Sequence, residues 1–95
     1  MKELNEKQLD KASNMLKAIA HPMRIAIINN LENGNELTVT QIHELLGIEQ
    51  STASHHLGIL KDRDVLSYKR EGKKTYYSLK HDKIASIVDC IKNCI

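Results

Sequence analysis

Large aromatic side chains are nearly missing from this sequence of 95 residues, which contains no phenylalanine, no tryptophan and three tyrosines. A folded domain built from it must therefore have an aliphatic core, and a chain of this length forms one such core rather than two. Because few large side chains are available for burial, a single copy would be marginally stable. Pairing with a second copy is expected on that ground alone.

Several other features are also absent. No apolar run approaches the length of a membrane-spanning helix, and the first residues alternate in charge instead of forming the apolar stretch of a secretion signal. The two cysteines lie close together near the end, so they do not form the disulfide framework of a small secreted protein. No linker and no internal repeat divides the chain. We therefore expect one domain over residues 1–95, in the cytoplasm and without membrane contact.

The formal net charge of +2 is unevenly distributed along the chain. Residues 1–47 carry 5 basic and 6 acidic side chains, residues 48–80 carry 7 basic and 4 acidic, and residues 81–95 are balanced. A local basic excess is what a surface that binds nucleic acid requires. An imbalance of this size also fits an ordinary solvated surface, so charge alone does not decide between the two.

Apolar spacing predicts two helices in the first third of the chain. Steps of three and four through Leu9 and Leu16 predict a helix over residues 5–20. It ends ahead of Pro22, because the residue before a proline avoids helical geometry. Pro22 then begins a helix to about residue 32, which is apolar on most sides and is therefore expected to be central.

Two further helices are expected on either side of a turn that contains Gly47. The first covers residues 40–46, with Thr40 as its N-cap, and the second covers residues 51–63. The residues expected to face inward are Ile42, Leu45 and Leu46 in the first helix, and Ala53, Leu57 and Leu60 in the second.

The pattern changes from residue 65 onward. Two runs of β-forming residues, 65–70 and 75–79, flank Glu71-Gly72-Lys73-Lys74, which indicates a hairpin with a basic tip. Apolar residues from Ile84 to Ile95 then return to helical spacing. The expected fold class is mainly α with a small β-hairpin, in the order helix, helix, helix, helix, hairpin, helix.

Two short helices joined by a glycine-containing turn, the second with small polar side chains, are typical of a helix-turn-helix. A helix that enters the major groove of DNA needs short hydroxyl, amide and imidazole groups, and residues 50–60 contain these without any acidic residue. The basic hairpin would extend to the flanking phosphates. The predicted DNA contacts are Gln50, Ser51, Thr52, Ser54, His55, His56 and Lys61 from the helix, and Lys69, Arg70, Lys73 and Lys74 from the hairpin. His55 and His56 could instead cap a helix or pack, and DNA contact is the favoured interpretation of both.

Three ordered motifs resemble the arsenic-repressor (ArsR) family of winged helix-turn-helix transcription regulators. Residues 18–25 resemble the start of its second helix, residues 50–60 its recognition helix, and residues 60–79 its strand, wing and strand. The resemblance implies a homodimeric repressor that binds an inverted-repeat operator in double-stranded DNA and leaves it when an inducer binds. Gly58 departs from the pattern, since the family often has lysine there, and this removes a phosphate contact.

Residues 40–63 are then the helix-turn-helix, residues 65–79 the wing, and the first and last helices the dimer interface. The interface residues expected on this basis are Leu9, Leu16, Ile84, Ile87, Val88 and Ile91.

The resemblance also raises the question of a sensor, because members of the family commonly bind metals. The Cys-x-Cys pair of the founding type is absent from residues 41–46, and His81, Lys83 and Cys94 are a poor match to a second type of site. Cys90 and Cys94 remain, four residues apart on one helix face. Three interpretations stay open: a soft metal ion or metalloid, a redox response, or simple packing, and no cofactor is certain.

Other classes of function find little support. The sequence has no nucleotide-binding loop and no HExxH motif, so we do not expect an enzyme. A winged helix used only for protein contacts is the main alternative, and it would favour an acidic or apolar recognition face.

Arg24 has two open interpretations, a phosphate contact or an ion pair at the dimer interface or core edge.

Overall fold

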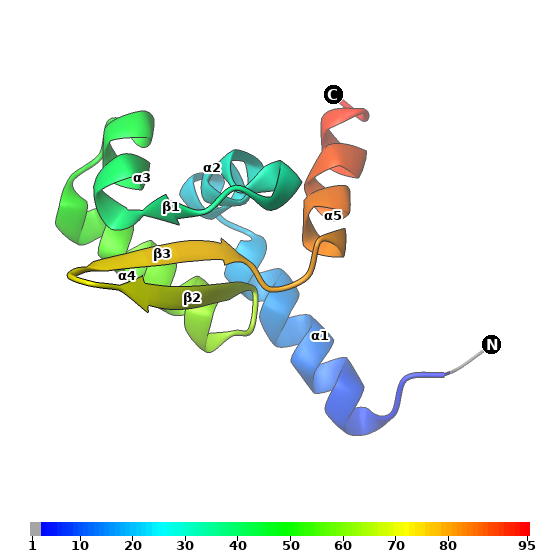
Figure 1. Ribbon diagram of the computed structural model, residues 1–95. Coiled ribbons are helices and arrows are strands. Elements are labelled where there is room, and N and C mark those ends of the chain that lie inside the picture. Colours follow the sequence, from blue (N-terminus) through cyan, green and yellow to red (C-terminus); the bar gives the residue numbers. More distant parts are fainter. Residues whose placement is uncertain (1–2) are drawn as a thin grey trace.

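The computed structural model describes residues 3–95 and confirms the expected winged helix-turn-helix (Figure 1). Its elements are α1 (Glu6–Ile19), α2 (Pro22–Asn30), the short 3-10 turn η1 (Glu32–Gly34), β1 (Leu37–Thr38), α3 (Val39–Leu46), α4 (Gln50–Asp62), β2 (Leu66–Glu71), β3 (Lys74–Leu79) and α5 (Lys83–Lys92). No helix within residues 3–95 is long and apolar enough to cross a bilayer.

The first two helices begin where local chemistry favours it. Asn5 caps α1 through a capping box, in which its side chain accepts from the Gln8 amide at 2.8 Å and the Gln8 side chain accepts from the Asn5 amide at 3.0 Å. Pro22 begins α2 as predicted. The helix ends at Asn30 rather than at residue 32, because Asn33 and Gly34 adopt positive φ angles of 62° and 75° in the following turn.

The start of α3 differs from the prediction. Its N-cap is Thr38 and not Thr40: the Thr38 hydroxyl accepts from the Gln41 amide at 3.2 Å, and Gln41 Oε1 accepts from the Thr38 amide at 2.9 Å. Residues Leu37 and Thr38 also form β1, which was not expected from the sequence. A strand of two residues shows no periodicity, so only its pairing with β3 reveals it.

The three strands form one antiparallel sheet in the order β1-β3-β2. Leu37 lies opposite Tyr77, Leu66 opposite Leu79, and Glu71 opposite Lys74. The connection between β2 and β3 is therefore a two-residue turn of Gly72 and Lys73, shorter than the four residues predicted. Gly72 has a φ of 61°, which a glycine at the first position of such a turn adopts without strain.

The core is aliphatic, as expected. Ile27 and Ile28 of α2 are fully buried, which confirms the central position of this helix. Ala53, Leu57 and Leu60 are also fully buried, whereas the prediction for α3 was only partly correct, since Leu45 is 61% exposed. The fully buried large side chains are Ile27, Ile28, Leu31, Ile42, Leu57, Leu60 and Val65.

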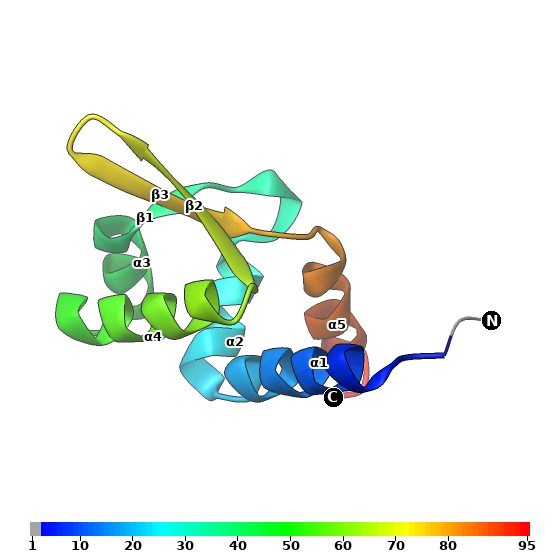
Figure 2. The ribbon, with the colours of Figure 1, turned by 90° about the horizontal axis from the view of Figure 1, so that it is seen from below.

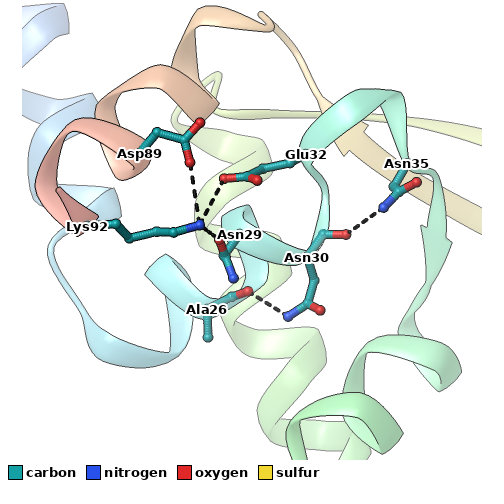
Figure 3. Close-up of polar contacts among 7 residues, drawn as sticks. All are labelled: Ala26, Asn29, Asn30, Glu32, Asn35, Asp89 and Lys92. Atoms are coloured by element: carbon teal, nitrogen blue, oxygen red, sulfur yellow. Dashed lines mark hydrogen bonds and ion pairs between the residues drawn. The ribbon is translucent and has the colours of Figure 1, made fainter.

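Figure 2 shows that the molecule has two ends: the tip of the β2–β3 hairpin, α3 and the start of α4 lie at one, and α1 and α5 lie toward the other. Polar contacts join α5 to α2 and η1 (Figure 3). The Lys92 ammonium donates to Asn29 Oδ1 at 2.7 Å and lies 3.7 Å from Glu32 Oε1 and 3.4 Å from Asp89 Oδ1. This ammonium compensates the buried Glu32 oxygen and holds the last helix against the central one.

Candidate nucleic-acid interface

The turn between α3 and α4 is built by local interactions that set the relation of the two helices. Gly47 ends α3 in the left-handed conformation, with a φ of 64°, and its amide donates back to the carbonyl of Glu44. The Ile48 amide donates to the carbonyl of His43, and His43 Nδ1 lies 3.2 Å from the Ile48 carbonyl oxygen. These contacts orient α4 so that its two faces have different environments.

The outer face of α4 carries most of the polar side chains that were predicted to contact DNA. It contains no carboxylate between residues 50 and 60, whereas the inner face buries Ala53, Leu57 and Leu60 in the core. Five predicted contacts are exposed here: Gln50, Ser51, Thr52, Ser54 and His55. Short uncharged groups on a helix that projects one face to solvent suit the edges of base pairs in a major groove.

His56 is the exception among the predicted contacts, because its side chain lies against the interior of the protein and not on the exposed face. The side chain is only 7% exposed, and its Nδ1 accepts a hydrogen bond from Arg24 Nε at 3.3 Å. Its ring lies 4.7 Å from that of His21 and 5.7 Å from that of His55. Burial, followed by the nearby His21, Arg24 and His55, lowers the pKa of His56. His56 therefore supports α4 from the interior of the protein, through its hydrogen bond to Arg24 of α2.

Arg24 also acts inside the protein. Besides its bond to His56, its Nη1 donates to the carbonyl of Ala18 at 3.0 Å, at the end of α1. Of the two interpretations left open from the sequence, this geometry favours a role at the edge of the core.

The hairpin, which we call the wing (β2, β3 and the turn between them), projects beside α4. Its exposed basic residues are Lys69, Arg70, Lys73 and Lys74, and the last three form no ion pair within residues 3–95. Lys73 and Lys74 line a hollow of about 440 Å³ together with Gln50 and Ser54 of α4. The wing and the polar face of α4 therefore contribute to one continuous surface.

Thr40 and Gln41 line the same hollow, from the first turn of α3. Neither was among the predicted contacts, since Thr40 was interpreted as a helix cap. Their position at a helix N-terminus, where free amide groups favour anions, is the signal that could have included them.

Two predicted basic contacts are engaged by neighbouring side chains. The Lys69 ammonium lies 2.9 Å from Glu36 and 3.2 Å from Glu71, and hydrogen bonds to these carboxylates raise the pKa of Lys69. The Lys61 ammonium lies 5.2 Å from the centre of the Tyr68 ring. The charge of Lys69 is balanced by these two carboxylates, so Lys69 attracts a phosphate less strongly than Lys73 and Lys74, which form no ion pair within residues 3–95.

Cys90 and Cys94 both have free, exposed thiols at the end of α5. Cys94 Sγ donates to the Cys90 carbonyl at 3.3 Å. Within residues 3–95, no group of three or more histidine, cysteine, aspartate or glutamate side chains is arranged to hold a metal ion. A single copy of the chain therefore offers at most a pair of thiols.

The predicted dimer interface is only partly available to a partner. Leu9, Leu16, Ile87 and Ile91 are 53%, 55%, 40% and 50% exposed. Ile84 and Val88 are 4% and 2% exposed, so they belong to the core of the chain itself and not to an outer surface. The exposed apolar residues lie on α1 and α5, at the end of the molecule away from the tip of the wing (Figure 2).

Comparison with known proteins gives a consistent picture. Residues 21–68 match the family model described as bacterial regulatory protein, arsR family. The transcriptional repressor PagR of Bacillus anthracis is 40% identical over 80 residues, which cover 84% of this chain and 80% of PagR. Its crystal structure superposes with a TM-score of 0.82 at 37% identity, over 92% of this chain and 99% of that one.

Two other relatives bear on assembly and on signal. The homodimeric winged helix-turn-helix DNA-binding domain of Mb0332 from Mycobacterium bovis has a TM-score of 0.80 at 27% identity, over 99% of this chain and 89% of that domain. A CadC homolog of Staphylococcus aureus, described as a cadmium resistance transcriptional regulatory protein, is 31% identical over 88 residues, 93% of this chain and 73% of that protein.

Proposed function

Because the chain belongs to the arsR family of bacterial regulatory proteins, we propose that it is a transcriptional repressor that binds operator DNA through α4 and the wing. One observation carries this proposal: residues 50–60 of α4 expose polar side chains and contain no carboxylate, and they adjoin Lys73 and Lys74 of the wing, which form no ion pair within residues 3–95, across a shared hollow. A groove contact and a phosphate contact can thus be made at the same time. The expected cytoplasmic location follows from this function.

The roles of the side chains differ within this surface. Gln50, Ser51 and Ser54 are placed to contact base edges, because they are short and exposed on α4. Lys73 and Lys74 contact the phosphates beside the groove, and Thr40 adds a contact from the first turn of α3. The residues that position the surface without touching DNA are His56, Arg24 and Gly47.

The functional unit is proposed to be a homodimer, as in the relative Mb0332. Exposed leucines on α1 and isoleucines on α5 supply an apolar surface that a second copy would cover. A twofold dimer presents two recognition helices, so it reads an inverted repeat whose half-site centres are about 34–36 Å apart. Sedimentation at micromolar concentration tests the dimer, and a monomer under those conditions would contradict it.

The experiment that tests DNA recognition begins with selection of preferred duplexes from a random library. Replacing Ser51 and Ser54 together by alanine should weaken binding to the selected duplex by about 0.5–1.5 kcal/mol per lost hydrogen bond. Binding to a random duplex should change less, because those contacts read sequence. Ser86→Ala on α5 is the matched control and should affect neither duplex. Equal affinities of the double variant and the wild type for the selected duplex would contradict the assignment of α4.

The inducer is the finer part of the proposal and rests on Cys90 and Cys94. Both thiols are exposed, Cys90 in the last turn of the helix that also carries the proposed dimer surface and Cys94 just after that helix, so a soft metal ion or an oxidant acting there could change the angle between subunits. Replacing both by serine should preserve DNA binding and abolish release by thiophilic metals or peroxide. If neither reagent releases the wild type, these cysteines are packing residues and the signal enters elsewhere.

A further inference from the structure

The surroundings of His56 contain several groups that are or can become positive. Arg24 Nε donates to His56 Nδ1 at 3.3 Å, and the rings of His21 and His55 lie 4.7 Å and 5.7 Å away. Within residues 3–95, no carboxylate forms an ion pair with Arg24 or with any of these three histidines. This cluster joins the start of α2 to the recognition helix without any negative charge to balance it.

The hydrogen bonds require two of the rings to be neutral. A guanidinium only donates, so His56 Nδ1 must present a lone pair to Arg24 and carry its proton on Nε2. The Met23 amide donates to His21 Nδ1 at 3.1 Å, which imposes the same tautomer on His21. Each of these bonds disappears when its acceptor nitrogen is protonated.

Proton uptake at His56 would have a direct structural effect. A solvent proton on Nδ1 would place an N–H group opposite the Arg24 N–H and a second positive charge beside the guanidinium, at a side chain only 7% exposed. The pKa of His56 is already held low by burial and by the three positive or titratable neighbours His21, Arg24 and His55. Arg24 also lines a hollow together with Lys17, Asp62 and Arg63, and the charges of these three residues sum to a positive value.

The bond between Arg24 and His56 is also specific to the recognition helix. Within residues 3–95, it is the one side-chain hydrogen bond that joins α2 to α4. Because Arg24 also donates to Ala18, its release from His56 leaves α1 and α2 connected by that bond, whereas α4 loses its side-chain hydrogen bond to α2 and keeps only its packing in the core. Ser54 and His55, on the exposed face of α4, directly precede His56 in the chain.

We propose that His21, Arg24 and His56 form an acid-sensitive latch, which fixes α4 to α2 while His56 is neutral and releases it when His56 is protonated. The consequence for DNA rests on the proposed function: acid would weaken operator binding by loosening the recognition helix. The latch itself is a property of the protein alone, and it can be measured without DNA.

Long-range proton–nitrogen NMR spectra of the wild type give the first test. At pH 7.5, His56 should be neutral with its proton on Nε2, and the neutral form of His21 should carry its proton on Nε2 as well. The pKa of His56 should lie below the ordinary histidine value of about 6.5. Finding the His56 proton on Nδ1, or a titration midpoint at or above about 6.5, would overturn the latch.

Hydrogen exchange gives the second test. The ordinary pKa of histidine is about 6.5, so at pH 5.5 the His56 ring of a released helix is protonated about ten times as often as it is neutral. If only the released helix takes up this proton, the ratio of latched to released helix falls by up to about tenfold. After correction for intrinsic exchange rates, protection of α4 amides should therefore fall by up to about tenfold between pH 7.5 and 5.5, with little change in α5. An equal loss in both helices would show global unfolding instead and would contradict local release.

Two variants separate the latch from other effects of acid. His56→Asn keeps an acceptor near the position of Nδ1 but does not titrate, so its α4 protection should not depend on pH in this range. His81→Asn is the control and should behave as the wild type. If His56→Asn fails to fold, the tautomers and titration of the wild type still decide the matter.

The DNA measurement uses the duplex selected by the wild type. Its affinity should fall more between pH 7.5 and 5.5 for the wild type than for His56→Asn, and this comparison cancels effects of pH that do not depend on His56. Equal losses would overturn the regulatory role of the latch. Absence of DNA binding at every pH would contradict the proposed function while leaving the NMR and exchange results to judge the latch.

Discussion

Replacing Lys73 and Lys74 together by glutamine tests whether the wing contacts phosphates, because each lost contact changes the salt dependence of DNA affinity by a known amount. Both ammonium groups are exposed and free of ion pairs within residues 3–95, so both are available to phosphates. Each neutralised phosphate contributes about 0.9 to the slope of log affinity against log salt. The double variant should therefore lose about 1.8 from this slope per protomer, or about 3.6 for a dimer.

The predicted difference is large enough for a simple assay. Over a fourfold rise in salt, a slope difference of about 3.6 means that the wild type loses about 150-fold more affinity than the variant. Fluorescence anisotropy on a selected and on a random duplex should give the same change in slope, since phosphates carry no sequence information. Lys83→Gln, on α5 and away from the tip of the wing, is the charge control. Identical slopes for the double variant and the wild type would refute the wing as a phosphate contact.

Four further predictions concern stability and are measured by urea unfolding. Leu57→Ala should cost about 2–5 kcal/mol because the side chain is fully buried, whereas the 61% exposed Leu45 should tolerate alanine within about 0.5 kcal/mol. Thr38→Ala should cost about 0.5–2 kcal/mol by removing the cap of α3. Gly58→Ala should stabilise α4 by about 1 kcal/mol, since an added methyl group meets nothing within 4 Å. The pKa of His56 is lower in the folded than in the unfolded chain, so the unfolded chain binds the proton more readily. The free energy of unfolding should therefore decline as the pH falls below about 6.5. A free energy of unfolding that does not depend on pH in this range, or that depends on pH equally in His56→Asn, would contradict this prediction.

Most of the fold could be predicted because its determinants are local. Pro22 begins a helix and Gly47 ends one for reasons that depend only on their own backbone geometry. Ala53, Leu57 and Leu60 repeat at helical spacing, and that spacing is enough to identify the buried face of α4. In contrast, β1 exists only because Leu37 lies opposite Tyr77, forty residues later in the chain, and no local pattern contains that information.

At His56, helical spacing and residue type point to different environments. His56 lies three residues after Ala53 and four before Leu60, so the same helical spacing that identified the buried face includes it. Its polar character and its place among serines and another histidine favoured DNA contact instead. The burial of an imidazole became understandable only with Arg24, which approaches from 32 residues earlier and supplies the hydrogen bond that a buried ring needs.

The apolar stripe of α5 shows the same limit at the opposite end of the molecule. At about 100° per residue, Ile84, Ile87, Val88 and Ile91 fall on one stripe, and periodicity treats them alike. The structure divides this stripe: Ile84 and Val88 are buried against the chain's own core, whereas Ile87 and Ile91 stay half exposed at its other edge. Helical spacing therefore predicts that a position is kept away from water, but it does not tell whether the chain's own core or a second copy covers that position.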